Sequence, residues 1–293
     1  MSKPFYGTFP VKEIDSAIDL DAVVIGVPYE DNSKIYPKGA STAPKNIRKA
    51  SFFFSGQSLS QQSIHQQNVL DLMNINENLN YEEMQKELSE RVQKILQKEA
   101  LPIILGGDHS IALGTAEGII KSETEIDSIV WIDAHLDLMN EYPEGEKFTR
   151  ATVLRRILEL GFVDPKKVHF IGSRGHNLGL EEIEYLKDQG MNVINAKTFQ
   201  NRKSMLDSLS KIVSHSNNIY VSLDIDVLDP AFTPGVSVPE PGGLSTRELF
   251  EVINLLAKNI KCFEIVEVNP ELDINDITSK IACKTIFELL DSI

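Results

Sequence analysis

Short apolar segments recur along the chain, and amphipathic stretches such as Tyr81–Glu99 and Thr246–Asn259 separate them with helical spacing. We expect the apolar segments to be strands because they are short and rich in β-branched residues. They are Asp21–Val27, Asn68–Leu72, Leu101–Leu105, Ser128–Ile132, Val168–Ile171, Asn192–Ala196, Ile219–Leu223 and Lys261–Val266. Near-continuous apolar strands that alternate with helices predict an α/β protein with a mostly parallel sheet covered on both faces.

Eight such strands are compatible with two architectures, an open three-layer α/β/α sandwich and a closed eight-fold barrel. In either one, functional groups should lie at the carboxyl ends of the strands. Ser51–Gln67 is a polar, Ser- and Gln-rich connection that breaks the pattern, and we expect a loop near the functional site there. Because no internal repeat and no Pro- or Gly-rich linker divides the chain, we expect one domain over residues 1–293.

Composition narrows the class of protein. The 29 Lys and Arg residues against 43 Asp and Glu residues give a formal charge of −14, which argues against a nucleic-acid partner. The chain has no apolar run long enough to span a membrane, and Met1–Pro10 lacks the apolar core of a signal peptide. We therefore expect a cytoplasmic protein without a membrane partner. Cys262 and Cys283 stand alone, without metal-binding spacing, and are expected to be buried thiols.

Two histidines and four aspartates follow three of the predicted strands. Gly106–Ser110 (GGDHS), Asp133–Asp137 (DAHLD) and Ser222–Asp226 (SLDID) each begin at or near a strand end. In an extended segment alternate side chains share a face, so the acidic and imidazole groups of each motif should point to one rim. The candidate ligands are His109, Asp133, His135, Asp137, Asp224 and Asp226.

Crowded carboxylates repel one another unless protons or cations neutralise them. Four aspartates carry a charge of −4, which two divalent cations would balance. Oxygen-rich ligation with some imidazole favours Mn²⁺, with Mg²⁺ or Zn²⁺ as alternatives. Two such ions would activate a water molecule at neutral pH. An isolated DxD is usually a solvated turn, but three motifs at three strand ends favour a binuclear centre.

Two further residues stand on the predicted rim. Glu267 follows the last strand in VEVNP, and its carboxylate could pair with a cation such as a guanidinium, which matches a carboxylate in a planar, bidentate way. A structural glutamate in a salt bridge is the alternative for this residue. His176 follows the fifth predicted strand in SRGHN and is a candidate for substrate contact, with a loop position of no special role as its alternative.

The motifs GGDHS, DAHLD, SLDIDVLDPAFTPG and VEVNP, in this order and spacing, resemble the ureohydrolase family of arginases and agmatinases. The resemblance covers nearly the whole chain. It implies an arginase-like open three-layer α/β/α sandwich with a central eight-stranded parallel sheet. It also implies two Mn²⁺ ions per subunit and a homo-oligomer, a trimer or a hexamer.

The resemblance also implies roles for individual residues. One ion would be bound by His109, Asp133, Asp137 and Asp224. The other would be bound by Asp133, His135, Asp224 and Asp226. Asp137 would in addition pass a proton from the attacking hydroxide to the leaving nitrogen, and Glu267 would hold the guanidinium of the substrate.

The segment Pro239–Gly243 (PEPGG) is similar to the agmatinase branch, and the loops after DAHLD and after the fifth predicted strand show no clear reader of an α-amino acid head. The resemblance thus favours a small-molecule guanidino substrate, agmatine, hydrolysed to urea and putrescine. Guanidinobutyrate, formiminoglutamate and arginine are alternative substrates, and a weakly active or regulatory homologue is a further alternative.

Arg150 is the point at which the chain departs from the family pattern, which usually has a histidine there. Arginine cannot titrate near neutral pH. We expect Arg150 at the mouth of the site, where it either turns outward to Glu144 or Glu146 or meets an anionic tail of the substrate. Arg150 and His176 therefore join Glu267 as candidates for substrate binding.

Overall fold

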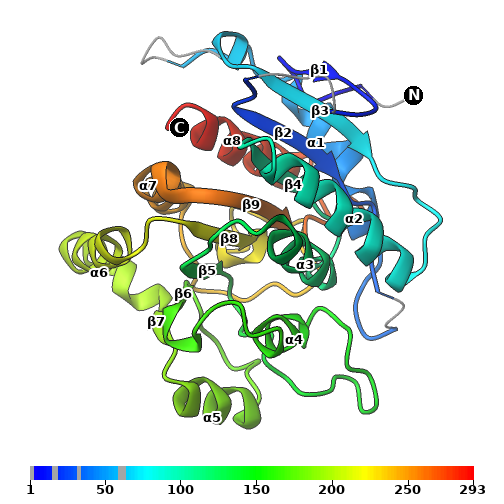
Figure 1. Cartoon of the computed structure of the whole chain (residues 1–293). Coiled ribbons are helices and arrows are strands. Elements are labelled where there is room, and N and C mark those ends of the chain that lie inside the picture. Colours follow the sequence, from blue (N-terminus) through cyan, green and yellow to red (C-terminus); the bar gives the residue numbers. More distant parts are fainter. Residues whose placement is uncertain (1–2, 15–18, 32–33, 59–63) are drawn as a thin grey trace.

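A single, wholly parallel sheet of nine strands forms the centre of the computed structural model, which describes residues 3–14, 19–31, 34–58 and 64–293 (Figure 1). The strand order is β1-β3-β2-β4-β9-β8-β5-β6-β7. The strands are β1 Phe9–Pro10, β2 Ala22–Gly26, β3 Val69–Asn74, β4 Leu101–Leu105, β5 Ser128–Ile132, β6 Val168–Ile171, β7 Asn192–Ile194, β8 Ile219–Asp224 and β9 Ile260–Val266.

All eight predicted strands are present, and the expected count was low by one. The additional strand, β1, has two residues, Phe9 and Pro10, and pairs with β3 at the edge of the sheet. Such a strand has no hydrophobic periodicity to detect, and its proline is tolerated because an edge strand needs fewer backbone donors.

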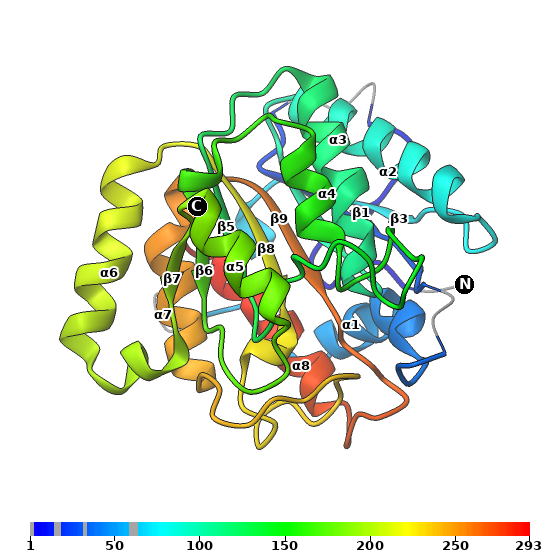
Figure 2. The same ribbon diagram turned by 90° about the horizontal axis from the view of Figure 1, so that it is seen from below.

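Helices cover both faces of the sheet, as Figure 2 shows from below. They are α1 Ala43–Ser51, α2 Tyr81–Leu96, α3 Ala112–Ser122, α4 Val153–Glu159, α5 Leu180–Gln189, α6 Arg202–His215, α7 Thr246–Leu256 and α8 Ile277–Leu290. Apolar residues of α1, α6, α7 and α8 form one core cluster against the sheet. Residues of α2, α3 and α4 form the second cluster, against which α5 packs. The fold is therefore the open sandwich, with β1 and β7 as its edges, and not the barrel.

Local signals at the helix ends agree with this arrangement. The side chains of Asn80 and Ser245 accept hydrogen bonds from the backbone N–H groups of Glu83 and Glu248. The carboxylates of Glu83 and Glu248 accept in turn from the backbone N–H groups of Asn80 and Ser245, so α2 and α7 each begin with a capping box. The described part of the chain contains no helix that is long and apolar enough to cross a membrane. Cys262 and Cys283 are buried free thiols, as expected.

The Ser51–Gln67 connection does not lie where we expected it. None of its described residues lines the pocket that holds the candidate ligands. Ile64 is instead bonded to Gly56, and the side chain of Gln67 donates to the backbone carbonyl of Leu290 at the end of α8. The reason is that α1 has already carried the chain back from the carboxyl end of β2 to the amino end of β3. Residues 59–63 lie outside the described part.

Candidate functional site

The candidate ligands and Glu267 come from four strands that are neighbours in the centre of the sheet, in the order β4-β9-β8-β5, with the ligands at the carboxyl ends of β4, β8 and β5. His109 follows β4, Asp224 ends β8, and Asp133 follows β5 directly. Glu267 follows β9, which lies between β4 and β8. Because parallel strands end at one edge, segments far apart in sequence deliver their polar groups to a single rim.

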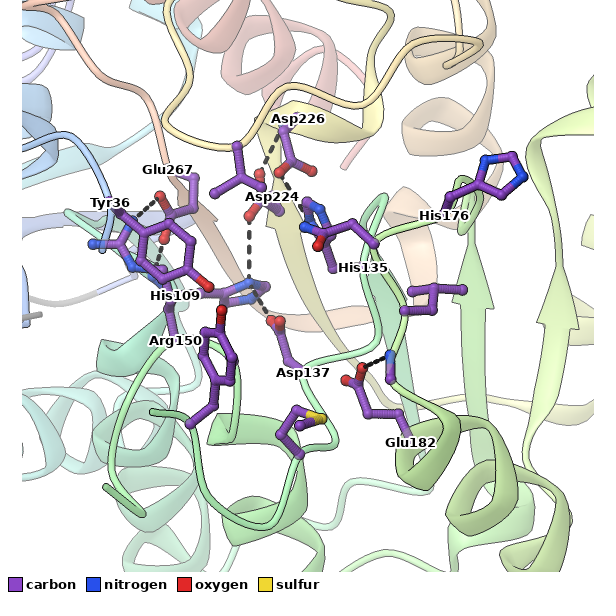
Figure 3. A pocket seen from close by; sticks show the side chains of 17 residues that line it. Tyr36, His109, His135, Asp137, Arg150, His176, Glu182, Asp224, Asp226 and Glu267 are labelled. Carbon is purple, nitrogen blue, oxygen red and sulfur yellow. Dashed lines mark hydrogen bonds and ion pairs between the residues drawn. The ribbon is translucent and has the colours of Figure 1, made fainter. Parts of the chain in front are cut away.

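Figure 3 shows the side chains that line one pocket of about 270 Å³, among them His109, Asp224 and Glu267. The described residues that line it are Tyr36, His109, His135, Asp137, Met139, Tyr142, Arg150, Ala151, His176, Asn177, Leu178, Gly179, Glu182, Asp224, Asp226, Val238 and Glu267. Of the six candidate ligands, only Asp133 does not line the pocket, and it is completely buried.

His109 lies at the centre of the first half of the cluster. Its Nδ1 atom is 3.0 Å from Asp137 Oδ2, 3.2 Å from Asp133 Oδ2 and 3.6 Å from Asp224 Oδ2. The segment after β5 bends instead of staying extended, and Asp137 has a left-handed backbone with φ 55°. The sequence predicts that Asp133 and Asp137 share a face because alternate side chains of an extended segment do so. The structure shows instead that a bend in the backbone brings them together at His109.

His135 lies at the centre of the second half. Its Nδ1 atom is 3.1 Å from Asp226 Oδ2 and 3.4 Å from Asp133 Oδ1. The side chain of Asp133 therefore faces both histidines. Two groups of potential ligand atoms can each surround a cation, His109 with Asp133 and Asp137, and Asp133 with His135 and Asp226. Asp224 is outside both compact groups but remains at the distance from His109 given above.

The donor set fits divalent cations. His109 Nδ1, Asp133 Oδ2 and Asp137 Oδ2 are buried and converge, yet none of them makes a hydrogen bond. Burial, followed by the charge of Asp133, raises the pKa of Asp137 to about 7, and burial together with Asp226 raises the pKa of Asp224. Four buried carboxylates are therefore not all ionised unless cations join them. Oxygen-rich groups with one imidazole each match the preferences of Mn²⁺.

A chain of hydrogen bonds fixes the ring of His109. Ser222 donates its hydroxyl proton to Glu264 at 2.6 Å, so its Oγ accepts from His109 Nε2 at 2.7 Å. The opposite nitrogen, Nδ1, then keeps its lone pair for a cation. The ring also stacks on Trp131, with 4.2 Å between the centroids and an interplanar angle of 3°.

His176 lies on the outer part of the pocket. Its ring is exposed and lies on the far side of the cluster from Glu267 (Figure 3). Contact with the distal part of a substrate remains a prediction for this residue.

Arg150 does not have either of the two expected orientations. Its guanidinium points inward and donates from Nη1 to Glu267 Oε2 at 2.7 Å and from Nη2 to Asp108 Oδ2 at 3.0 Å. Nε approaches Asp31 Oδ2 at 3.4 Å. Glu144 and Glu146 take no part in these bonds. The physical reason is that three buried carboxylates attract a guanidinium more strongly than exposed ones do.

Sequence reasoning missed Asp31 and Asp108 as well as the pocket residues Tyr36 and Glu182. Glu182 is buried and accepts hydrogen bonds from the backbone N–H groups of Leu138 and Gly179. Asp108 lies inside the GGDHS motif, where its position before His109 was the available signal. Asp31 and Tyr36 lie in the loop after β2, from which the sequence reasoning drew no candidate residue.

Comparison with known proteins agrees with this geometry. The model of the family described as "Arginase family" matches residues 20–291. The human mitochondrial guanidino acid hydrolase is 31% identical over 277 residues, which are 92% of this chain and 78% of that protein. The chicken mitochondrial agmatinase is 31% identical over 281 residues, which are 94% of this chain and 82% of that protein.

Among solved structures, the proclavaminate amidino hydrolase of Streptomyces clavuligerus superposes with a TM-score of 0.88 at 27% identity, covering 100% of this chain and 97% of that one. The match of the family model spans every strand from β2 to β9 and all candidate ligands. The chain therefore belongs to the arginase family of hydrolases.

Proposed function

We propose that the protein is a binuclear-metal ureohydrolase that hydrolyses a cationic guanidino compound, with agmatine as its substrate. The observation that carries this proposal is the convergence of two imidazoles and four carboxylates, with unpartnered buried atoms, at one side of a pocket. In the reaction, R–NH–C(NH₂)₂⁺ and water would give R–NH₃⁺ and urea.

Asp133 faces both histidines, and six residues would hold two Mn²⁺ ions: His109, Asp133, His135, Asp137, Asp224 and Asp226. When bound, these ions would supply an activated water at neutral pH. Asp137 would in addition accept a proton from this water and deliver it to the leaving nitrogen. Glu267 is the carboxylate that we assign to the guanidinium of the substrate.

The charge of the pocket supports a cationic substrate. Besides the proposed metal ligands, whose charge the cations would balance, Glu182 and Glu267 line it, and Arg150 is the only Lys or Arg among its described lining residues. Arg150 already pairs with three carboxylates. A guanidino acid would therefore find no unpaired lysine or arginine among these residues for its carboxylate, whereas the ammonium of agmatine would face the carboxyl group of Glu182.

A panel assay tests the substrate. The Mn²⁺-loaded protein would be given agmatine, arginine, guanidinobutyrate and formiminoglutamate, and urea or formamide would be measured. We expect urea from agmatine. Release of product from one of the other substrates alone would reject agmatine, and release from none would reject the hydrolase itself.

Metal content tests the centre. Elemental analysis of the Mn²⁺-saturated protein should give two ions per chain, and His135→Ala should retain one and lose most turnover. A saturated wild-type protein with at most one ion per chain would contradict the binuclear assignment.

A further inference from the structure

Three carboxylates enclose the guanidinium of Arg150 beside the candidate metal centre. Asp31 follows β2, Asp108 follows β4, and Glu267 follows β9. The side chains of Arg150 and of these three acids are each 6% exposed or less. The ring of Tyr36 covers the guanidinium, with 5.0 Å from Cζ to the ring centroid. We call Asp31, Asp108 and Glu267 the guanidinium site.

The backbone holds two of the three carboxylates of this site, those of Asp108 and Glu267, in place without help from Arg150. Asp108 accepts hydrogen bonds from the backbone N–H groups of Ser110 at 3.0 Å and Asp31 at 2.6 Å. Glu267 accepts one from the backbone N–H of His109 at 2.9 Å. The guanidinium site is thus built into the loops of the metal centre.

A close approach of two loops explains why the sequence has Gly107 at this point. The carbonyl oxygen of Tyr29 would lie 1.7 Å from a Cβ atom on Gly107. Asp108 N–H donates to the same carbonyl at 3.1 Å. A side chain at residue 107 would push the loop that carries Asp31 away from Asp108.

Arg150 presents to this site the same chemical group that a guanidino substrate would bring. A guanidinium matches carboxylates through planar, paired N–H donors. Two guanidinium groups cannot occupy the same edge of one carboxylate at the same time. One oxygen of Glu267 is bonded to Arg150 and the other to the backbone of His109. Departure of Arg150 would leave Asp108 and Glu267 buried without their cation and Asp31 with the more distant Lys38, at 3.9 Å, which is unfavourable.

We propose that Asp31, Asp108 and Glu267 form a guanidinium-binding site that Arg150 fills from within, so that Arg150 is a specificity-determining residue that competes with the guanidinium of the substrate. This inference rests on the proposed hydrolysis of guanidino compounds. It predicts that the wild-type chain binds agmatine weakly, and that removal of the Arg150 side chain opens the site.

Steady-state kinetics of Arg150→Ala tests the competition. Alanine cannot transfer protons, so any gain comes from the vacated site. We expect kcat/KM for agmatine to rise by at least about tenfold, mostly through KM. Arg155→Ala is the matched control, because Arg155 pairs with Glu181 and Tyr185 and does not line the pocket. It should stay within about twofold of wild type. A folded Arg150→Ala protein with unchanged or lower kcat/KM overturns the proposal.

A binding measurement tests the site without turnover. Millimolar guanidinium chloride should raise the melting temperature of Arg150→Ala saturably and more than sodium chloride does. The wild type, with its site filled, and Arg150→Ala/Glu267→Gln, with its site damaged, should show no such rise. Absence of the rise in a folded Arg150→Ala protein overturns the proposal.

A third variant covers the case in which Arg150→Ala does not fold. Arg150→Gln keeps a polar side chain but removes the charge that holds it among the three carboxylates. Its kcat/KM for agmatine should also rise by at least about tenfold, mostly through KM, and an unchanged or lower value in this folded variant would overturn the proposal. Should no variant release urea while guanidinium still stabilises Arg150→Ala, the hydrolase assignment fails and the guanidinium site stands.

Discussion

The orientation of His109 depends on three residues that were not candidates from the sequence. Ser222 accepts from its Nε2, Glu264 accepts from Ser222, and Trp131 stacks on the ring. Glu264 is completely buried and also accepts from Thr115 at 2.7 Å. Because every partner is itself held, Nδ1 has one orientation, toward the aspartates.

Ser222→Ala should therefore weaken metal binding without removing a proposed ligand. Loss of such a supporting hydrogen bond costs about tenfold or more in metal affinity. Calorimetric titration with Mn²⁺ measures it. Ser122→Ala is the control, since that hydroxyl bonds to Ile119 and Thr124 at the end of α3, away from the pocket. Equal Mn²⁺ affinity in the two variants would show that Ser222 does not orient His109.

His169 gives a prediction for pH. Burial in β6, followed by the charge of Lys167, lowers its pKa to about 4. The unfolded chain binds a proton near pH 6.5, and the folded chain does not until about pH 4, so this residue makes folding less favourable as the pH falls through that window. His169→Gln should lose less stability than wild type between pH 7 and pH 4.5 in urea titrations. Parallel curves for the two proteins would contradict the assignment.

At the scale of elements, α1 is fastened to β3 by a buried ion pair. Arg48 donates from Nε and Nη2 to the two oxygens of Asp71, both at 2.8 Å, and from Nη1 to Asn74 at 2.6 Å. Asp71 also accepts from the backbone N–H of Phe5 at 2.7 Å. One carboxylate thus joins the edge of the sheet, the N-terminal segment and the helix.

Asp71→Ala should destabilise the protein strongly, because it leaves Arg48 buried without its partner. Breaking a buried pair in this way costs about 3–5 kcal/mol in the free energy of unfolding, which denaturant titration measures. The neighbouring Lys49 pairs with Asp276 at the surface, and Lys49→Ala should cost about 0–1 kcal/mol. If Asp71→Ala lowers the free energy of unfolding by less than Lys49→Ala does, the buried ion pair does not hold α1 in place.

At the scale of the whole molecule, the chain has 43 acidic and 29 basic residues, and several of the acidic side chains are buried in the interior. Asp133, Asp224 and Asp226 are 3% exposed or less, and Asp137 is 7% exposed. These carboxylates lie at the ends of central strands, where their mutual repulsion lowers the stability of the folded chain. Cations that bind there should stabilise the folded chain by linkage.

Chelation should accordingly lower the melting temperature, and Mn²⁺ should restore it. At a free Mn²⁺ concentration about a hundredfold above its dissociation constant, one site adds about 2.7 kcal/mol to the free energy of unfolding. Differential scanning calorimetry with EDTA and then with added Mn²⁺ measures the effect, with potassium chloride as the ionic-strength control. A melting temperature that stays the same when Mn²⁺ is added would argue against a metal centre.

The sequence by itself determined the strands and the positions of the candidate ligands, because both are local properties. A strand such as Ser128–Ile132 is recognised by its short run of apolar and β-branched residues, and Asp133 follows it directly in the sequence. Prediction from a local pattern also explains why the edge strand Phe9–Pro10 was missed, because a strand of two residues is too short to show a hydrophobic periodicity.

Only the tertiary structure decided which of these groups meet. The order β4-β9-β8-β5 places His109 beside Glu267 and Asp224, and nothing in any one segment encodes it. Arg150 is 117 residues from Glu267 and 119 from Asp31 in the chain, so reasoning from neighbours in sequence directed it to Glu144 or Glu146. Its inward orientation depends on the total charge and burial of loops from three strands, and these exist only once the sheet has formed.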